Sequence, residues 1–303
     1  MNSIEIRELT REYGSTRAVD RLTFDVLPGR VTGFLGPNGA GKSTTMRLLL
    51  GLDRATAGTA TVGGRKFTTF TDPLRRVGAL LDPQSIHGGR TARDHLRLLA
   101  ATNRIPARRV EEVLEQAGIA SAAKRRVKTF SLGMRQRLGI AAALLGDPGV
   151  LLLDEPTNGL DPEGIIWIRE LMRGLAAEGR TVLVSSHLMS ETATLADHLI
   201  VLGAGRLLAD TSMEEFIEAR STPRVRLRTS DPIRLRAALA RDGFELVDAG
   251  GGRWTVDGIQ AERLGAMAAR EGIPMLELAD ERASLEQAYL DLTADHAQFA
   301  ATH

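Results

Sequence analysis

The chain of 303 residues contains no cysteine. This absence excludes a disulfide framework, a zinc–thiolate site and a cysteine nucleophile. An excess of charge of one sign is also missing, because 39 basic residues face 38 acidic ones and leave a net charge of +1. Proteins that bind nucleic acid through their charge are usually basic, so the composition gives no indication of a nucleic-acid partner.

Two further absences concern membranes. No unbroken apolar run reaches the ~18 residues that a membrane-spanning helix needs, so no such helix is predicted. The first residues, MNSIEIRELTREYG, lack the basic start and apolar core of a secretory signal. A role at a membrane would therefore require a separate partner chain. The chain does contain 43% hydrophobic residues, which is enough to bury a core.

The part of the chain before residue 220 alternates strands with helices. Continuous apolar runs over 31–35, 150–153 and 181–185 are typical of strands that are buried on both faces of a parallel sheet. Residues 3–9 and 22–27 alternate apolar and polar side chains, which predicts two further strands. The apolar spacing is helical at 43–50, through much of 91–126, at 132–145 and at 165–178.

A different order of elements follows a short linker at 219–223. We predict strand 224–228, helix 231–242, strands 244–248 and 253–257, helix 259–270, strand 273–278, and a last helix over 284–292. The order βαββαβ is that of the ferredoxin-like arrangement. We place the arginines of PRVRLR on the solvent face of the first of these strands, with Val225 and Leu227 inside. The sequence therefore predicts two domains, 1–219 and 220–303.

A glycine-rich loop stands between the strand at 31–35 and the helix at 43–50. Its sequence GPNGAGKST matches the pattern G-x-x-x-x-G-K-[ST]. Glycines let several backbone N–H groups face one anion, and the following helix N-terminus adds partial positive charge. Lys42 would reach the β- and γ-phosphates and Ser43 would face Mg²⁺; a turn that binds nothing is the alternative. The nucleotide-binding residues expected here are Gly36, Pro37, Asn38, Gly39, Ala40, Gly41, Lys42, Ser43 and Thr44.

Two adjacent acids end the buried run VLLLDEP. Asp154 is the expected Mg²⁺ partner, either directly or through water, and Glu155 is the expected residue that holds and polarises an attacking water. Phosphoryl transfer depends mainly on such positioning and on stabilisation of charge. Alternatively, the two acids simply end a strand and begin a loop, an interpretation that the nearby phosphate loop makes less attractive.

The segment FSLGMRQR, residues 130–137, resembles the signature motif of ABC transporter ATP-binding subunits in a variant form. Leu132 replaces the usual second glycine and Met134 replaces the usual glutamine. In this family the motif of one protomer holds the γ-phosphate bound by the other, so the resemblance implies that Ser131, Gly133 and Met134 contact nucleotide. A serine at a helix N-terminus suits an anion.

Further segments resemble motifs of the same family, in the family's order. Residues 158–161, NGLD, resemble the D-loop and include Asp161; His187, after the strand at 181–185, resembles the H-loop residue that contacts the γ-phosphate and the water. Tyr13 resembles the aromatic residue that stacks on adenine. Without the resemblance, His187 could be structural and Tyr13 could be a surface residue of a turn.

One position departs from the family pattern. Alignment of residues 77–96 places Asp82 where the Q-loop usually has glutamine, and Gln84 follows two residues later. Either residue could sense Mg²⁺ and the attacking water. An aspartate could bind Mg²⁺ more directly. We favour Asp82 by register and keep Gln84 as the alternative.

The resemblance covers about residues 3–215 and implies the fold and activity of this part. It implies an α/β P-loop NTPase of ABC type, with an N-terminal antiparallel β subdomain and a helical subdomain at about 85–145. It implies ATP and Mg²⁺ as cofactors, with Lys42, Glu155 and His187 as catalytic residues and Ser43, Asp154 and Asp82 at the metal. We expect a head-to-tail homodimer that hydrolyses ATP.

The C-terminal region, which ends in ASLEQAYLDLT at 283–293, resembles the extension of drug- and antibiotic-export subunits. This second resemblance implies a separate ABC-2 type permease, a peripheral location at the cytoplasmic face of the membrane, and export of an antibiotic, drug or lipid-like molecule. The alternatives are a soluble ABC ATPase that acts as a ribosome- or DNA-associated nucleotide switch, and a scaffold that binds ATP with little hydrolysis. We expect no nucleic-acid partner.

Overall fold

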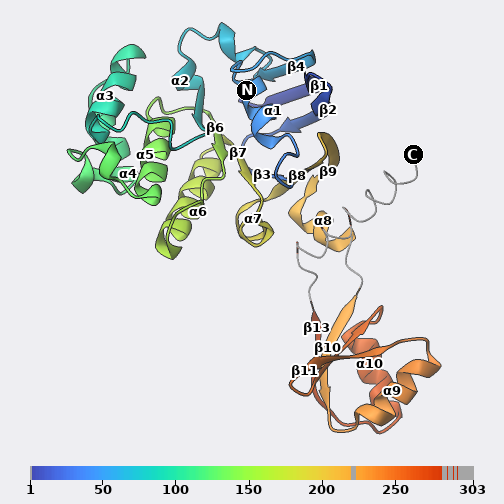
Figure 1. Cartoon of the computed structure of the whole chain (residues 1–303). Helices are drawn as coiled ribbons and strands as arrows, with labels where there is room; N and C mark the ends of the chain where they lie inside the picture. Colours follow the sequence, from blue (N-terminus) through green and yellow to red (C-terminus); the bar gives the residue numbers. More distant parts are fainter. Residues whose placement is uncertain (1, 220–222, 282–284, 286–288, 290–291, 293–303) are drawn as a thin grey trace. The chain divides into compact units, whose positions relative to one another are not determined.

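The computed structural model of the chain describes residues 2–219, 223–281, 285, 289 and 292. It divides into two compact units, Met1–Met213 and Glu214–His303. Figure 1 labels the helices and strands of both units.

A six-stranded sheet forms the centre of the first unit, with the strand order β5-β6-β7-β3-β8-β9. The neighbouring strands are parallel except for β8 and β9, which are antiparallel. The strands span β3 Val31–Leu35, β5 Val77–Leu80, β6 Val150–Asp154, β7 Thr181–Ser186, β8 His198–Gly203 and β9 Arg206–Ser212. Pairing of Leu35 with Ser186 and of Asp154 with Ser185 brings the carboxyl ends of β3, β7 and β6 side by side.

Both faces of this sheet are covered, which explains the continuous apolar runs in its strands. Leu151 and Leu153 of β6 pack into one hydrophobic cluster with α3, α4, α5 and α6. Val150 and Leu152, which point to the opposite face, pack with α1 and a second sheet. Figure 1 shows these two layers on either side of the central strands.

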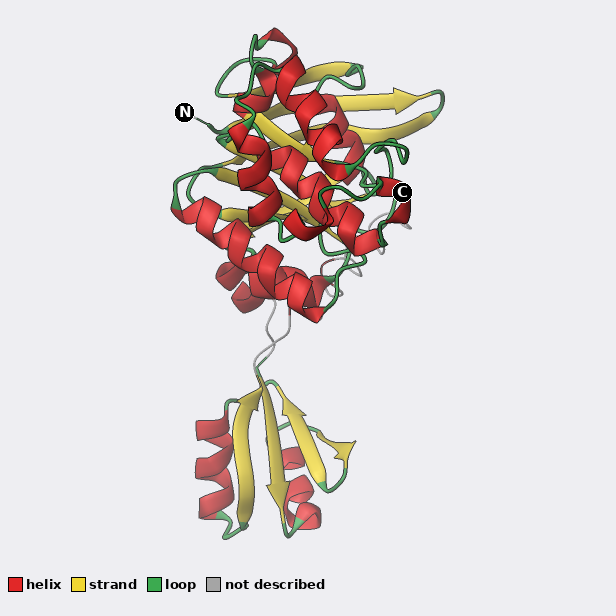
Figure 2. Ribbon diagram, turned by 90° about the vertical axis from the view of Figure 1, so that its left-hand side faces the viewer, coloured by secondary structure: helices red, strands yellow, loops and turns green. Residues whose placement is uncertain are grey.

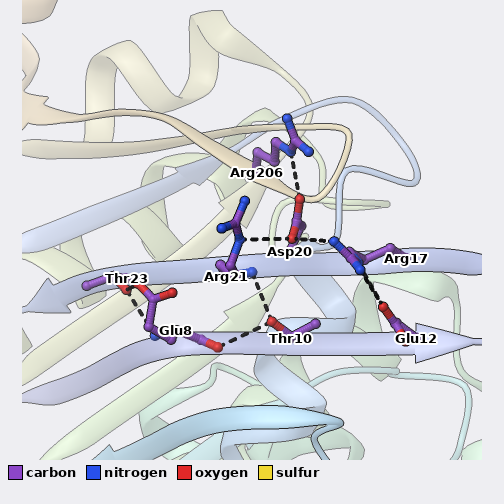
Figure 3. Close-up of polar contacts among 8 residues, drawn as sticks. All are labelled: Glu8, Thr10, Glu12, Arg17, Asp20, Arg21, Thr23 and Arg206. Atoms are coloured by element: carbon purple, nitrogen blue, oxygen red, sulfur yellow. Dashed lines mark hydrogen bonds and ion pairs between the residues drawn. The ribbon is translucent and has the colours of Figure 1, made fainter.

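The second sheet is antiparallel, with the order β2-β1-β4. Its strands are β1 Ile4–Tyr13, β2 Thr16–Val26 and β4 Ala57–Val62. The register of β1 and β2 shifts between Ile6 and Leu9, and Glu8 and Arg21 take the left-handed φ values of 46° and 49°. Figure 3 shows how Thr10 and Thr23 hydrogen-bond the backbone on both sides of this irregularity. A register shift of this kind bends a hairpin and strengthens its twist.

The helical region expected at about 85–145 consists of separate short helices. The described helices of the first unit are α1 Lys42–Leu49, α2 Pro73–Arg76, α3 Ala92–Thr102, α4 Arg108–Gln116, α5 Leu132–Leu144, α6 Pro162–Ala177 and α7 Met189–Leu195, with α8 Met213–Ala219 at the boundary; 3₁₀ turns span Phe67–Thr69, Ala120–Ala122 and Val127–Thr129. Among the described residues, no helix is both long and apolar enough to span a bilayer.

The second unit has a four-stranded sheet with the order β11-β12-β10-β13, in which all neighbours are antiparallel. Its elements are β10 Arg224–Thr229, α9 Pro232–Arg241, β11 Leu246–Gly250, β12 Arg253–Asp257, α10 Ala261–Arg270 and β13 Met275–Glu281. Val225 and Leu227 are buried in a core with both helices, while the arginines of β10 are exposed, as expected. Figure 2 shows the strands in yellow and the two helices in red.

The helix expected over 284–292 falls largely outside the described residues. Of that segment the structure describes Leu285, Tyr289 and Leu292, and all three side chains are buried.

Candidate functional site

The loop between β3 and α1 wraps around the amino group of Lys42. The Nζ atom donates to the carbonyl oxygens of Gly36 and Pro37 at 2.6 and 3.3 Å, and only 6% of the residue is exposed. Burial lowers the pKa of Lys42, although Glu155 and Asp154 act in the opposite direction. Gly41, which precedes the helix, has φ 101°, a conformation that suits glycine. The loop therefore holds a cation at a helix N-terminus.

A pocket of about 480 Å³ lies over this loop. It brings together parts of the chain that the sequence separates by more than a hundred residues. Its lining includes residues 38–44 of the loop, Ala18 of β2, Pro83 and Gln84, Leu132 and Gln136 of α5, Asp154, Glu155 and Asn158. The pocket thus contains a phosphate-binding loop and two carboxylates, which is the chemistry needed to bind and cleave a nucleoside triphosphate.

The two acids at the end of β6, Asp154 and Glu155, have different surroundings. Asp154 is 8% exposed, and its carboxylate accepts a hydrogen bond from the hydroxyl of Ser185. Glu155 leaves the strand with φ 49°, and its N–H donates to Ser185 Oγ at 3.0 Å. An L-residue in the left-handed region is uncommon and occurs most often where neighbours hold it. Ser185 therefore fixes both acids at once.

His187 follows β7 and lies against Glu155. Its Nδ1 is 2.7 Å from Glu155 Oε2, and the two side chains are 40% and 21% exposed. The carboxylate can accept a hydrogen bond from this ring nitrogen, which orients the imidazole. The structure therefore brings Lys42, Glu155 and His187, the three expected catalytic residues, to the same end of the sheet.

Ser43 and Asp154 both line the pocket. These are the two residues that the sequence predicted at Mg²⁺ independently of the family resemblance. They offer one hydroxyl and one carboxylate, and Ser185 occupies only one oxygen of Asp154. No cluster of three or more His, Cys, Asp or Glu suited to a metal occurs in the described part of the chain. Few protein ligands and an open pocket fit Mg²⁺, which keeps several waters and binds substrate phosphates.

The third residue expected at the metal, Asp82, is not part of the pocket lining. Its Oδ1 accepts a hydrogen bond from the N–H of Gln84 at 2.8 Å, which turns the carboxylate back onto its own loop. Gln84 lines the pocket instead. The structure thus favours the alternative residue of the Q-loop segment over the one that the alignment register favoured.

Tyr13 lies at the end of β1, outside the lining of the pocket. Its hydroxyl donates to Asp53 Oδ2 at 3.1 Å, and Arg11 lies over its ring at 4.2 Å from the centroid. Arg47 binds the same carboxylate at 2.7 Å. The ring is therefore fixed at its hydroxyl and on one face, and the residue is 44% exposed. An exposed aromatic ring held in this way can stack on a base.

The hairpin that carries Tyr13 is attached to the phosphate loop through β2. A side chain at Gly41 would place its Cβ 2.6 Å from the carbonyl oxygen of Ala18, and one at Gly205 would place it 2.9 Å from the same atom. The N–H of Asp20 donates to the carbonyl of Gly205 at 2.8 Å. The backbone of β2 therefore packs directly against the loop and against the turn between β8 and β9.

Three guanidinium groups surround the buried carboxylate of Asp20 (Figure 3). Arg206 of β9 binds it at 2.7 Å and Arg17 at 3.1 Å, and the carboxylate is 4% exposed. Burial acts to raise the pKa of Asp20, but the hydrogen bonds and charges of these arginines outweigh it and hold the pKa below its usual value. This cluster joins the antiparallel sheet to the central sheet beside the pocket.

The remaining expected contacts lie outside the pocket of the chain that carries them. Ser131 is exposed and caps α5, accepting from Met134 N at 3.2 Å. A side chain at Gly133 would place its Cβ 2.7 Å from the carbonyl of Gly159, so residues 158–161 pack on this helix end. Asp161 caps α6, accepting from Gly164 N at 2.9 Å. Within one chain, Ser131, Gly133 and Asp161 are therefore not part of the pocket lining, although their neighbours Leu132 and Asn158 are.

Several residues of the site were missed by reasoning from the sequence. Gln136 lies within the motif FSLGMRQR, and Ser185 lies in β7 two residues before His187, so both stood close to recognised residues. Asn158 was placed only in the D-loop, yet it also lines the pocket. For Ala18 and Asp20 no sequence signal existed, because their roles come from the packing of distant backbone segments.

Two family models match the chain. A model described as "ABC transporter" matches residues 19–158. A model described as a domain of unknown function (DUF8746) matches residues 223–286. The first match contains the phosphate loop, the exposed cap at Ser131 and the two acids after β6.

The chain is similar to curated transport proteins over most of its length. It is 37% identical to the bacitracin transport ATP-binding protein BcrA of Bacillus licheniformis over 302 residues, which cover 95% of this chain and 96% of the relative. It is 36% identical to the lantibiotic transport ATP-binding protein SrtF of Streptococcus pyogenes, over 68% of this chain and 90% of the relative.

A solved structure of similar fold is described as the ATP binding subunit of an ABC transporter. The two chains share 26% identity and superpose with a TM-score of 0.65, over 71% of this chain and 92% of the other.

Proposed function

Because this chain belongs to the family of ABC transporter ATP-binding subunits, we propose that it forms a head-to-tail homodimer which drives export of an antibiotic or similar small molecule through a separate permease. It binds ATP and hydrolyses it, as the family does. The observation that carries the proposal is the convergence of Lys42, Asp154 and Glu155 in one pocket.

Each residue of the pocket has a task in this reaction. Lys42 exchanges its bonds to backbone carbonyls for bonds to the β- and γ-phosphates, and the N–H groups of the loop bind the same oxygens. Glu155 orients and polarises the attacking water. His187, 2.7 Å from the Glu155 carboxylate, keeps that carboxylate in place. Asp82 or Gln84 senses the nucleotide from the side, and Gln84 has the better position.

Ser43 and Asp154 would hold Mg²⁺, which would supply positive charge to neutralise the phosphates. Tyr13 stacks on adenine with the ring face that Arg11 leaves free.

Two copies complete each site. In one chain Ser131 at the start of α5 is exposed, and Ser131, Gly133 and Met134 are not part of the lining of that chain's own pocket. A helix N-terminus with a serine cap binds anions well. In the dimer this end contacts the γ-phosphate held by the partner, and the loop with Asp161 crosses between the copies. ATP closes the pair because it is bound from both sides, and hydrolysis reopens it.

The second unit is a ferredoxin-like accessory domain, a proposal supported by its strand order β11-β12-β10-β13. The proposed domains are 1–219 and 220–303, with the helical subdomain at about 85–145. The permease is of ABC-2 type, and the protein lies peripherally at the cytoplasmic face of the membrane. Similarity to bacitracin and lantibiotic transport proteins over most of the chain supports an antibiotic-like cargo.

Co-purification tests the proposed partner. An affinity-tagged chain extracted in mild detergent should bring down a polytopic membrane protein in stoichiometric amount, and ATP hydrolysis by the complex should require Mg²⁺. If the chain instead sediments with ribosomes or binds DNA in a nucleotide-dependent way, the export proposal is wrong.

Mixed dimers test the shared sites. Wild-type chains are titrated with Glu155→Gln chains, and turnover per wild-type site is measured. Coupled sites predict that this turnover changes as mixed dimers form. Unchanged turnover at every ratio would contradict the coupling of the two sites.

A further inference from the structure

Gln136 is a buried polar residue in the first turns of α5 that hydrogen-bonds the backbone of Glu155. It has 0% exposure and lines the nucleotide pocket. Its Nε2 donates to the carbonyl oxygen of Glu155 at 3.2 Å. Of the two polar ends of a side-chain amide, only the NH₂ group can donate to a carbonyl, so the orientation of this amide follows from its partner.

The other end of the same side chain has no use in the fold. The Oε1 atom of Gln136 is buried and has no hydrogen-bond partner within the described part of the chain. Buried acceptors are almost always satisfied in folded proteins, and an exception calls for an explanation. An apolar side chain of this length would avoid burying an unsatisfied acceptor. The bond to Glu155 is therefore the feature that distinguishes glutamine at this position.

The carbonyl that Gln136 holds belongs to a residue in an unfavourable backbone conformation. Glu155 has φ 49°, and its N–H is held by Ser185 while its carbonyl also accepts from the N–H of Asn158 at 3.2 Å. Rotation of this residue toward an ordinary conformation would swing the carboxylate away from His187. Among these bonds, the one from Gln136 is the only one that originates on α5.

We propose that Gln136 is a positioning residue for ATP hydrolysis, which ties the helix that begins at Ser131 to the backbone of the catalytic Glu155. The inference rests on the proposed function. In the dimer, the N-terminus of α5 contacts the nucleotide of the partner, and Gln136, five residues further on, holds the Glu155 that acts on the chain's own nucleotide. One rigid helix thereby connects the two ATP sites.

Two substitutions in the full-length dimer test this role. Gln136→Met removes the donor and keeps the length of the side chain. We expect kcat to fall about tenfold, the effect of one hydrogen bond, while KM for ATP stays within about twofold. The second substitution is Gln136→Glu. Its control is Gln116→Glu, which makes the same exchange at an exposed position at the end of α4 and should keep wild-type turnover.

The pH profile of Gln136→Glu separates positioning from a structural role. Burial raises the pKa of the introduced carboxyl, and its protonated form can donate to the Glu155 carbonyl, whereas its ionised form repels that oxygen. The ratio of variant to wild-type kcat should therefore be highest at about pH 6 and fall as the pH rises toward about pH 9.

Three results would overturn the inference. Turnover within twofold of wild type in both Gln136 variants would show that the bond is not needed. A parallel loss of nucleotide affinity and thermal stability, with a pH-independent ratio, would assign Gln136 to the fold alone. A wild-type chain without ATP turnover would contradict the proposed function itself, whereas active wild type with unaffected variants would contradict only the role of Gln136.

Discussion

The six-stranded sheet of the first unit and the four-stranded sheet of the second unit are built by different rules. All of β6 in the six-stranded sheet is buried, whereas β10 of the four-stranded sheet alternates exposed arginines with buried Val225, Leu227 and Thr229. Among the described residues, every non-glycine residue with positive φ belongs to the first unit: Glu8, Arg21, Arg104, Asp147, Glu155 and Ala204. In the second unit, the described positive-φ residues are glycines.

The difference teaches where backbone strain is tolerated. Glu155 is the proposed catalytic residue, Glu8 and Arg21 bend the hairpin beside the pocket, and Ala204 lies in the turn that packs on β2. For Arg104 and Asp147, which lie in the helical region and before β6, the structure offers no link to the site. The second unit, built with relaxed turns and exposed ion pairs, is expected to contribute packing rather than chemistry.

The sharpest test of this comparison exchanges one carboxylate in each unit for an amide. Glu155→Gln should keep ATP binding and lower turnover on the order of 10²–10³-fold, as for other groups that position a reacting water. Glu277→Gln breaks the exposed pair with Arg226, 3.1 Å away, and should leave turnover unchanged. Steady-state hydrolysis and nucleotide titration measure both. Normal turnover in Glu155→Gln would remove this residue from its role.

Truncation of one core leucine in each unit tests whether the units are independent. Leu152→Ala and Leu227→Ala each empty a fully buried site and should lower the free energy of unfolding of the host unit by about 2–5 kcal/mol. Leu227→Ala should leave ATP hydrolysis within about twofold of wild type, because the described pocket residues all belong to the first unit. Calorimetry and hydrolysis rates give the answer; a large loss of turnover would indicate that the units are coupled.

The next largest effect is expected when the buried carboxylate of Asp20, which lies among arginines, is replaced. Asp20→Asn removes the charge that Arg206 and Arg17 bind and should destabilise the first unit by about 1–3 kcal/mol, since charge-assisted hydrogen bonds are the strong ones. Denaturant unfolding measures the loss. A stability within about 0.5 kcal/mol of wild type would mean that exposure of the arginines screens the cluster.

The smallest effect is expected from Asp257, an exposed carboxylate of the second unit that also binds an arginine. Hydrogen bonding to Arg224 lowers the pKa of Asp257, although burial acts against it. A lowered folded-state pKa stabilises the fold above the ordinary carboxyl value of 3.8 and loses this contribution as pH falls through the folded-state pKa. Asp257→Asn should therefore cost less than about 1 kcal/mol at neutral pH and nothing at about pH 2. Unfolding curves at the two pH values test this sign.

Much of the architecture follows from local patterns in the sequence. The continuous apolar runs at 31–35, 150–153 and 181–185 correspond to β3, β6 and β7, because strands buried on both faces cannot alternate. The element order of the second unit was also predictable, with β11 beginning at Leu246 rather than at 244. The helical region was less predictable, because apolar spacing does not specify where a helix stops and a 3₁₀ turn begins.

The site was predictable where a motif carries its own geometry, as in the loop at 36–44. The site was less predictable where the orientation of a side chain decides whether it lines the pocket. Asp82 and Gln84 are two residues apart, yet the carboxylate of Asp82 accepts from the N–H of Gln84 on its own loop, while Gln84 lines the pocket. Gln136 gave no signal because its partner is a backbone carbonyl nineteen residues away in the sequence.

The carbonyl oxygen of Ala18 leaves room for no side chain at either Gly41 or Gly205. These positions belong to three distant stretches of the gene, yet a larger residue at either glycine would have to push the whole β2 backbone outward. In the evolution of such a chain, the two glycines are thus not free to mutate separately. A lineage that replaced one of them would need a shifted hairpin first, so comparison of diverged copies should find both retained or both changed.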